Sequence, residues 1–462
     1  IFFKKLLTNT PKFAAKPFDY IFSGGAFMTS CTKIKEDFWS IIQEMETHIP
    51  DFVVNPNKHF LRNRKLNFET MLKMTLLLEG RSINGEIDEF FDSNLTMPSA
   101  SAFCQQRAKL LPDAFKYIFD KFNVQYSHNP TYQGYRLLAC DGSECLFFPD
   151  KNQVEYHVSC NAYATVNAIH VNAMYDLLGH RYVDAVLQPR RKKSENRAFC
   201  TMIDRLAMPE EQKVIFIADR GYEGYNQLVH IHKKNMYFLI RVKDHPKNGI
   251  LTSFCYPAEP EFDCVYPLTF TRSCSIQKEY SSSRVYKRIS TAHVYDYMDE
   301  LDRQDYDLDL RVVRIHIGNG VYESLITNLP SASFPVSKLK ELYNMRWGIE
   351  TSFRDLKHTI QLTDFHGKKP EFIQQEIYAR LAIYNFCAAI KQALKIEKET
   401  SKYKYEVNFR MLVKICRRFL KKKRDDEWIR KILEKYLLPV RPGRRYHRKN
   451  VHKGIKSFLY RN

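Results

Sequence analysis

The sequence predicts an α/β protein whose mixed sheet is flanked by helical regions on both sides. Apolar residues recur at three- and four-residue spacing before residue 130 and after residue 336, as on one face of an α-helix. Between these regions, short apolar runs alternate with helical segments, which is typical of a mixed α/β sheet. From about 242 to 330 the helical spacing gives way to alternating, β-rich runs, so we expect a β-rich insertion within the core.

The charge balance favours a polyanionic partner. The 462 residues include 72 Lys and Arg against 52 Asp and Glu, a net charge of +20. Nucleic acid is the first candidate and an anionic membrane the weaker one. There is no apolar run of the roughly 20 residues that span a bilayer, so we expect no membrane partner. Eleven cysteines without a C-x-x-C pair do not predict a zinc site and fit reduced thiols in a cytosolic protein.

The changes of pattern divide the chain into six regions. Residues 28–133 are expected to form a helical DNA-binding region, although a helical cap on the main domain fits equally well. Residues 134–241 and 333–395 carry the two parts of the core, on either side of the β-rich insertion at 242–332. Residues 396–462 form a basic helical region.

The remaining region, residues 1–27, precedes the first methionine, Met28. Gly24 and Gly25 lie just ahead of that methionine, and two glycine codons can spell a bacterial ribosome-binding sequence. We therefore hypothesise that 1–27 is a non-native upstream extension and that Met28 is the natural start. A genuine N-terminal extension is the alternative, and the nucleotide sequence distinguishes the two.

Within the core, strands and helices follow one another in a regular order. Strands are expected at YRLLAC (135–140), TVNAIHVNAMYDLL (165–178), RYVDAVLQP (181–189), KVIFIA (213–218) and YFLIRV (237–242). A helix with Ser194 as its N-cap precedes the fourth strand, and a second helix (225–235) precedes the fifth.

Two acidic residues come directly after predicted core strands. Asp141 follows YRLLAC and Asp219 follows KVIFIA, and a glycine-containing turn follows each. Sites form where the strands of an open α/β sheet end, because the backbone leaves a crevice there. Taken singly, each aspartate reads as a structural cap; the pair suggests a site.

A stripe of four functional side chains follows in the run YNMRWGIETSFRDLKH. Tyr343, Arg346, Glu350 and Lys357 have offsets of 0, 3, 7 and 14. At about 100° per residue these fall within roughly 60° of one another on a helix. A solvated salt-bridge ladder is the alternative, since Arg346 lies four residues before Glu350.

The Glu350 carboxylate of this stripe, together with the two aspartates, suits phosphate chemistry with metal ions. Mg²⁺ prefers carboxylate, water and phosphate oxygens. We expect Asp141, Asp219 and Glu350 to be catalytic and to hold two Mg²⁺ ions, with Mn²⁺ as a substitute. Arg346 and Lys357 would bind flanking phosphates, and Tyr343 would donate to a phosphate oxygen.

The pattern Y-x₂-R-x₃-E-x₆-K resembles the signature of insertion-sequence transposases of the group called family four. DGS at Asp141 and DRGY at Asp219 resemble the first and second acidic motifs of that family. The resemblance implies an RNase H-like core interrupted by a β-rich insertion. It also implies a DDE transposase that cuts and rejoins DNA at transposon inverted repeats, acting as a homodimer in a synaptic complex.

The chain departs from some relatives, in which a tryptophan of the insertion stacks on a flipped base. Its tryptophans are Trp39, Trp347 and Trp428, and none lies in 242–330. The resemblance therefore supports the metal chemistry more firmly than a hairpin intermediate. We expect Trp347 to pack beneath its helix.

Further DNA contacts are expected from Arg220 and Tyr222, which follow Asp219. The equally good alternative is that these two side chains pack within the turn. A basic segment from Arg417 to Arg424, together with the basic tail from Arg441 to Lys456, is expected to bind phosphate backbone.

The chain is thus expected to work on DNA in the bacterial cytoplasm, associated with the nucleoid. A catalytically silent DNA-binding protein and an RNase H-like nuclease remain the alternatives.

Overall fold

The structure is a computed structural model. It describes residues 30–440, apart from residues 63, 128–129, 162–163, 210, 245–248, 253, 273–283, 291–294, 299–304, 397 and 400–402. The expected upstream extension at 1–27 and the basic tail from Arg441 lie outside the described residues.

The core is a mixed sheet in which β2 and β4 both pair with β3, and the order then runs β1, β5 and β6. Strand β1 pairs antiparallel with β3, which pairs antiparallel with β4, whereas β1, β5 and β6 run parallel. An antiparallel meander followed by two parallel strands is the RNase H-like arrangement that the resemblance implied. The core elements are β1 (Tyr135–Phe147), β2 (His157–Asn161), β3 (Ala164–Asp176), β4 (Arg181–Pro189), η2 (Arg190–Lys192), α6 (Glu195–Arg205), β5 (Lys213–Ala218), η3 (Arg220–Tyr222), α7 (Tyr225–Lys233) and β6 (Tyr237–Val242).

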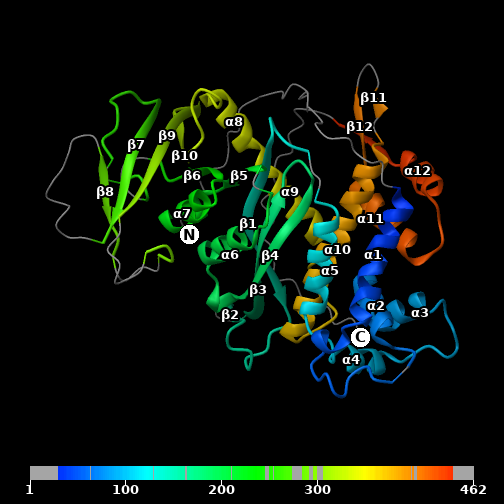
Figure 1. Ribbon diagram of the computed structural model, residues 1–462. Coiled ribbons are helices and arrows are strands. Elements are labelled where there is room, and N and C mark those ends of the chain that lie inside the picture. The colour runs from blue at the N-terminus through cyan, green and yellow to red at the C-terminus, as the bar shows by residue number, and fades with distance from the viewer. Residues whose placement is uncertain are drawn as a thin grey trace.

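The β-rich insertion continues the core sheet. Strand β10 pairs antiparallel with β6, with Thr327 opposite Leu239, and the order then runs β9, β7, β8. Its strands are β7 (Phe262–Thr271), β8 (Val285–Arg288), β9 (Tyr306–Gly318) and β10 (Val321–Thr327). They extend to one side of the molecule (Figure 1). This pairing covers the edge of β6, whose unpaired N–H and C=O groups would otherwise be exposed.

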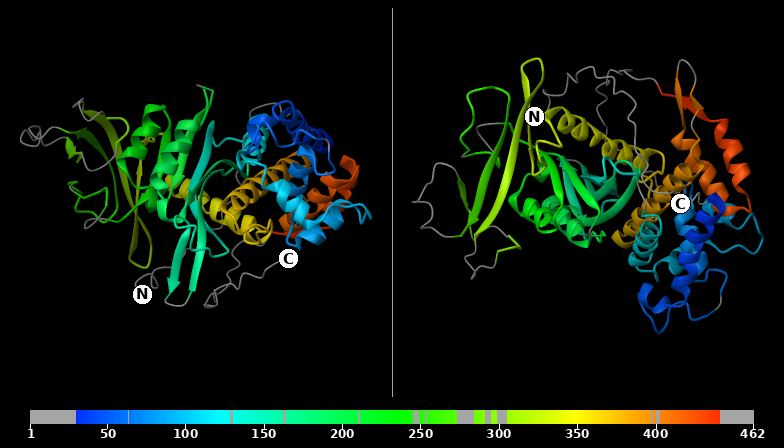
Figure 2. Two further views of the ribbon diagram at one scale, coloured as in Figure 1. Left: turned by 90° about the horizontal axis from the view of Figure 1, so that it is seen from below. Right: turned by 45° about the horizontal axis from the view of Figure 1, so that its top comes forward.

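Helices cover both faces of the core sheet (Figure 2). On one face, Phe199 of α6 and Leu228 of α7 pack with Phe216 and Phe238 of the parallel strands. Helices α9 and α10 lie on the other face. The helices that follow the insertion are α8 (Val336–Met345), α9 (Trp347–His358) and α10 (Pro370–Leu394).

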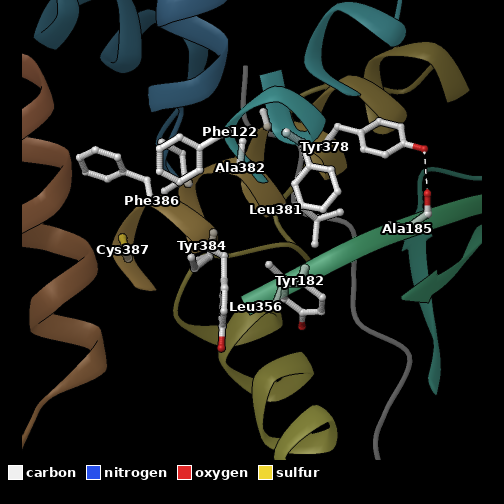
Figure 3. Packing of buried hydrophobic residues seen from close by; sticks show 14 of the residues in the cluster. Phe122, Tyr182, Ala185, Leu356, Tyr378, Leu381, Ala382, Tyr384, Phe386 and Cys387 are labelled. Carbon is white, nitrogen blue, oxygen red and sulfur yellow. Dashed lines mark hydrogen bonds between the residues drawn. The ribbon is translucent and has the colours of Figure 1, made fainter. Parts of the chain in front are cut away.

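Helix α10 is the central element of this second layer. Its sequence has apolar residues all round, so it is buried on every side rather than along one stripe. Phe386 lies 5.1 Å from Phe38 between ring centroids, and Tyr378 donates to the carbonyl of Ala185 on β4. Figure 3 shows this packing, with Tyr182 of β4 and Leu356 of α9 reaching the same helix.

The N-terminal and C-terminal helices pack against each other and on α10, although they are far apart in sequence (Figure 1). Asp426 of α12 accepts hydrogen bonds from the backbone N–H groups of Cys31 and Thr32, which begin α1. The elements are α1 (Cys31–Glu46), η1 (Ile49–Phe52), α2 (Phe68–Leu77), α3 (Ile83–Phe90), α4 (Ala100–Arg107), α5 (Asp113–Gln125), β11 (Lys398–Glu399), β12 (Lys404–Val407), α11 (Phe409–Lys421), α12 (Asp426–Glu434) and β13 (Leu437–Pro439). In the part of the chain that is described, no helix is both long enough and apolar enough to cross a bilayer.

The basic segment expected to bind phosphate is only partly available for it. Arg417 is buried, with 5% of its surface exposed, and donates to the carbonyl of Leu78. Lys421 pairs with Glu89 at 2.7 Å. These two side chains therefore hold α11 against the N-terminal helices, which corrects the expectation for them.

Candidate active site

The two aspartates lie side by side at the end of the parallel pairing. The register between β1 and β5 ends with Cys140 opposite Ala218, so Asp141 and Asp219 occupy the next position of each strand. Strand β1 does not end at Asp141, as the apolar run had indicated. It continues to Phe147 by pairing with β3, where Asp141 lies opposite Ala173. Only its pairing with β5 stops there, and that opens the crevice.

Glu350 reaches this crevice from the first turn of α9. The single helix expected over 336–360 is two helices, α8 and α9, separated at Arg346. Arg346 keeps right-handed helical angles, and its N–H donates to Tyr343 three residues back, so the direction changes little. The stripe of side chains therefore survives the break in the helix.

The electrostatics show that the three carboxylates converge. Burial, and then the negative charges of Glu350 and Asp219, raise the pKa of Asp141 to about 6. The N–H of Gly142 and the charge of Arg346 oppose this shift. Like charges raise the pKa of a carboxyl group only at short range. Asp141, Asp219 and Glu350 thus form one acidic cluster, although more than 200 residues separate its ends.

Arginines pair with two members of the cluster. Arg346 donates to Glu350 at 2.6 Å, and Arg241 of β6 lies 3.2 Å from Asp219. Arg241 also pairs with Glu323 of β10, at 3.1 Å, and burial raises the pKa of Glu323. Neither Arg241 nor Glu323 was among the residues that the sequence pattern predicted for the site. A charged residue within the apolar strand YFLIRV was the available signal for Arg241.

Two buried polar atoms at the site lack a partner. Tyr343 and Arg346 have only 4% and 3% of their surfaces exposed. The Oη atom of Tyr343 and the Nε atom of Arg346 make no hydrogen bond to any described residue. An unsatisfied buried donor costs about 1–3 kcal/mol, so such groups require an explanation. An oxygen-rich ligand at the site would satisfy both.

The other predicted site residues have different surroundings. Arg220 is exposed beside Asp219. Lys357 is partly buried near β1, where its charge opposes the burial that raises the pKa of Cys145. Tyr222 is 2% exposed and packs on Phe199 in the core, so the expected DNA contact is wrong for this residue. Trp347 is 44% exposed, so it does not pack beneath its helix as expected.

The side chains at the site fit a divalent cation by their chemistry. Carboxylates are hard oxygen ligands, which divalent cations such as Mg²⁺ prefer. Three carboxylates close together repel one another, and a bound cation would offset that repulsion. As these side chains stand, no group of three or more His, Cys, Asp or Glu within the described ranges is arranged to hold a metal ion. Arg346 and Arg241 are paired with Glu350 and Asp219 instead.

The fold and the acidic cluster together define a protein of the RNase H-like class. The family model described as the transposase DDE domain matches residues 132–386, more than half of the chain. The chain therefore belongs to the DDE transposases, within the IS4 family. Members of this family generally use divalent metal ions.

Individual relatives match more limited parts of the chain. The InsG transposase of insertion sequence IS4 from Escherichia coli K12 is 38% identical over 64 residues, 13% of this chain and 14% of that protein. The transposase of IS231E from Bacillus thuringiensis subsp. finitimus is 19% identical over 296 residues. That match spans 56% of this chain and 59% of the relative, less than two thirds of its length. A solved structure of a piggyBac transposase synaptic complex with hairpin DNA aligns with this chain at a TM-score of 0.43 and 12% identity. The alignment covers 89% of this chain and 86% of the piggyBac chain.

Proposed function

We propose that this protein cleaves DNA strands at the ends of a mobile element and transfers them into target DNA. The observation that carries the proposal is the convergence of Asp141, Asp219 and Glu350 beside the unpartnered donors of Tyr343 and Arg346. A phosphodiester cleavage site must bind positive metal ions and negative phosphate oxygens. The acidic cluster suits the metal ions, and the neighbouring hydrogen-bond donors suit the phosphate oxygens.

The three carboxylates would hold two Mg²⁺ ions, for which Mn²⁺ can substitute. Such ions, when bound, activate the attacking hydroxyl or water and stabilise the leaving oxygen. For binding to occur, Arg346 and Arg241 must release Glu350 and Asp219. Both arginines have other partners within reach, since Arg241 already contacts Glu323 and Arg346 lies over the rings of Tyr343 and Trp347.

The donors next to the cluster would hold the scissile phosphate. Arg346, once released from Glu350, presents a planar guanidinium that suits two phosphate oxygens, and its Nε atom already lacks a hydrogen-bond partner among the described residues. Tyr343 would donate its phenolic hydrogen to the same group. Lys357, about two turns after Glu350 on α9, and the exposed Arg220 would contact neighbouring phosphates.

A basic cleft in the N-terminal helices would bind the same DNA at a distance from the active site. It has a volume of about 230 Å³ and is lined by Arg64, Lys65 and Lys109 together with Gln105 and Gln106 at the end of α4. Lysines and arginines supply backbone contacts, and glutamine amides can read base edges. This cleft supports a DNA-binding role for residues 28–133.

The protein would work as a homodimer, because two transposon ends must be brought together. As a DNA-processing enzyme it would act in the bacterial cytoplasm, on nucleoid DNA. Light scattering of the protein with and without end DNA tests the assembly: a monomer on paired ends would contradict the dimer.

The decisive experiment measures strand cleavage of labelled DNA taken from both flanks of the gene, in Mg²⁺, in Mn²⁺ and in EDTA. We expect nicks that require a divalent ion. Glu350→Gln should bind this DNA as the wild type does but lose cleavage by at least about 100-fold, as when a charge-stabilising group is removed from an active site.

Glu341→Gln is the matched control, since Glu341 lies on α8 and is not part of the cluster. It should cleave normally. Normal cleavage by Glu350→Gln would refute the assignment of the site. Tight DNA binding without cleavage by the wild type would instead favour a catalytically silent DNA-binding protein, and cleavage without any strand transfer would favour a nuclease.

A further inference from the structure

A fourth carboxylate, that of Glu195, lies at the end of the core sheet. Glu195 begins α6, whose N-cap Ser194 accepts a hydrogen bond from the N–H of Arg197. A Cβ atom placed on Gly142 would lie 3.2 Å from Glu195 Oε1, and one on Gly221 would lie 3.4 Å from Oε2. Gly142 directly follows Asp141, and Gly221 comes two residues after Asp219. The carboxylate of Glu195 therefore spans the two chain segments that carry the aspartates.

The two glycines explain how Glu195 reaches this place. Side chains alternate along a strand, so Cys140 and Gly142 face α6 while Asp141 faces α9. A side chain at Gly142 or Gly221 would stand between α6 and the crevice. Without one at either position, the end of the sheet is open to Glu195 from the α6 side.

A buried histidine holds this carboxylate. His170 of β3 is 2% exposed, and its Nε2 atom lies 3.1 Å from Glu195 Oε1. Neither ring nitrogen of His170 makes a hydrogen bond of good geometry within the described part of the chain, so the contact with Glu195 is at ion-pair distance and the ring has no other partner there. A Cβ atom on Gly142 would be only 2.5 Å from Nε2, so the imidazole occupies the space that the glycine leaves. Burying an imidazole without well-aligned hydrogen bonds costs free energy, so its position requires an explanation.

Glu195 is negatively charged at neutral pH. The contact with His170, and then the one with Lys193, at 3.0 Å, lower the pKa of Glu195 to about 2 against the effect of burial. Burial raises the pKa of the Tyr222 phenol, and the charges of both Asp141 and Glu195 raise it further. The two carboxylates therefore act on the same side chain from close by.

The position of the two oxygens indicates what Glu195 can bind. His170 and Lys193 both contact Oε1. No described residue donates to Oε2, the oxygen on the side of Gly221 and hence of the Asp219 segment. A glutamate that only stabilised the N-terminus of α6 would need neither a buried histidine nor two facing glycines.

We propose that Glu195 is a fourth carboxylate of the metal-binding site, with His170 as its positioning residue. This inference rests on the proposed function, because it extends the site of Asp141, Asp219 and Glu350. The ligand is a divalent cation, which Oε2 helps to hold from the α6 side of the sheet. His170 fixes the carboxylate by binding Oε1 and does not itself contact the cation.

Calorimetric titration of the full chain with Mn²⁺ alone, without DNA, tests the proposal. Glu195→Gln should weaken Mn²⁺ binding by at least about 10-fold, because even the residues that only orient a metal ligand contribute about 10- to 100-fold to metal affinity. The control is Glu144→Gln, which removes one negative charge from the face of β1 that carries Gly142. Glu144 pairs there with Arg190 at 2.6 Å. It should bind Mn²⁺ as the wild type does.

Two variants of His170 separate positioning from packing. His170→Phe keeps a ring of similar volume but loses the donor, and we expect weaker Mn²⁺ binding. His170→Gln keeps a donor and should retain more of the affinity. A purely structural histidine would show the opposite order, because phenylalanine fills the buried space better.

Asp141→Asn distinguishes the failure of this inference from that of the proposed function. If Asp141→Asn loses Mn²⁺ binding and Glu195→Gln does not, Glu195 is not a ligand and the proposed function stands. If Asp141→Asn also binds Mn²⁺ normally, the proposed metal site itself is wrong.

A second measurement uses the wild type, so it holds even if a variant fails to fold. Fe²⁺ with ascorbate and peroxide cuts the backbone near a bound ion, and mass spectrometry locates the cuts. We expect cuts near Gly142, Gly221 and also Ser194–Glu195. Cuts near the two glycines but none at the start of α6 would overturn the proposal.

Discussion

Replacing Asp141 by asparagine should make the folded protein more stable while it abolishes cleavage. Burial and the neighbouring carboxylates raise the pKa of Asp141 from its ordinary value of 3.8 to about 6. This rise in the pKa corresponds to about 3 kcal/mol, since a tenfold change in an ionisation constant is about 1.36 kcal/mol. This is the free energy that the folded protein loses by keeping Asp141 charged without a metal ion. Asparagine has a similar shape and no charge, so it removes that cost.

The pH dependence has a definite sign. The folded-state pKa is raised, so the cost is fully present above about pH 6. It disappears as the pH falls below the ordinary pKa of 3.8, where Asp141 is protonated in both the folded and the unfolded state. The stability advantage of Asp141→Asn should therefore be largest at pH 7.5 and become small as the pH approaches 3.8.

The assay is thermal unfolding of wild type and variant in EDTA. For a domain of about 150–250 residues, 1 kcal/mol shifts Tm by about 2–4 °C, so we expect an increase on the order of 5–10 °C at pH 7.5. Excess Mn²⁺ should raise the Tm of the wild type and leave that of the variant unchanged. Asp88→Asn, at an exposed position on α3, is the control and should change neither value.

An Asp141→Asn protein that is equally stable or less stable than the wild type in EDTA would refute the reasoning. It would mean that burial and the neighbouring carboxylates do not disfavour the charged form of Asp141. The acidic cluster would then lack the excess negative charge on which the metal proposal depends.

Three further predictions concern packing and electrostatics. Phe386→Ala should destabilise the protein by about 3–5 kcal/mol in urea unfolding, because α10 would lose ring contacts with α1 and α5. A cost below about 1 kcal/mol would show that α10 is loosely packed against these helices. Glu376→Gln should cost about 3–5 kcal/mol by leaving Arg107, 3.0 Å away and 2% exposed, without its counter-charge, and a neutral result would contradict the burial of this pair. Gly142→Ala should destabilise the protein through its clash with His170, and adding His170→Ala should recover part of the loss in a double-mutant cycle; strictly additive effects would contradict the contact.

Much of the core could be predicted from local pattern. Strands at 213–218 and 237–242 were predicted with the observed bounds, and Ser194 caps α6 as expected. The break at Arg346 was not predicted, since helical periodicity continues through a single altered turn. The continuity of the insertion with the core sheet was not predictable either, because an alternating strand does not specify its neighbour.

Within the site, the sequence by itself determined the four side chains of one helical stripe and the two strand-end aspartates. These depend on periods of 3.6 and 2 residues, which are local properties of the chain. Tertiary structure alone decided that the Tyr343 hydroxyl has no hydrogen-bond partner among the described residues, whereas Tyr222 is part of the core. It also decided that Arg241 and Glu323 pair beside Asp219, and that His170 contacts Glu195 at the same end of the sheet. Such contacts arise from strand register and helix packing between segments far apart in the chain, so no local pattern records them.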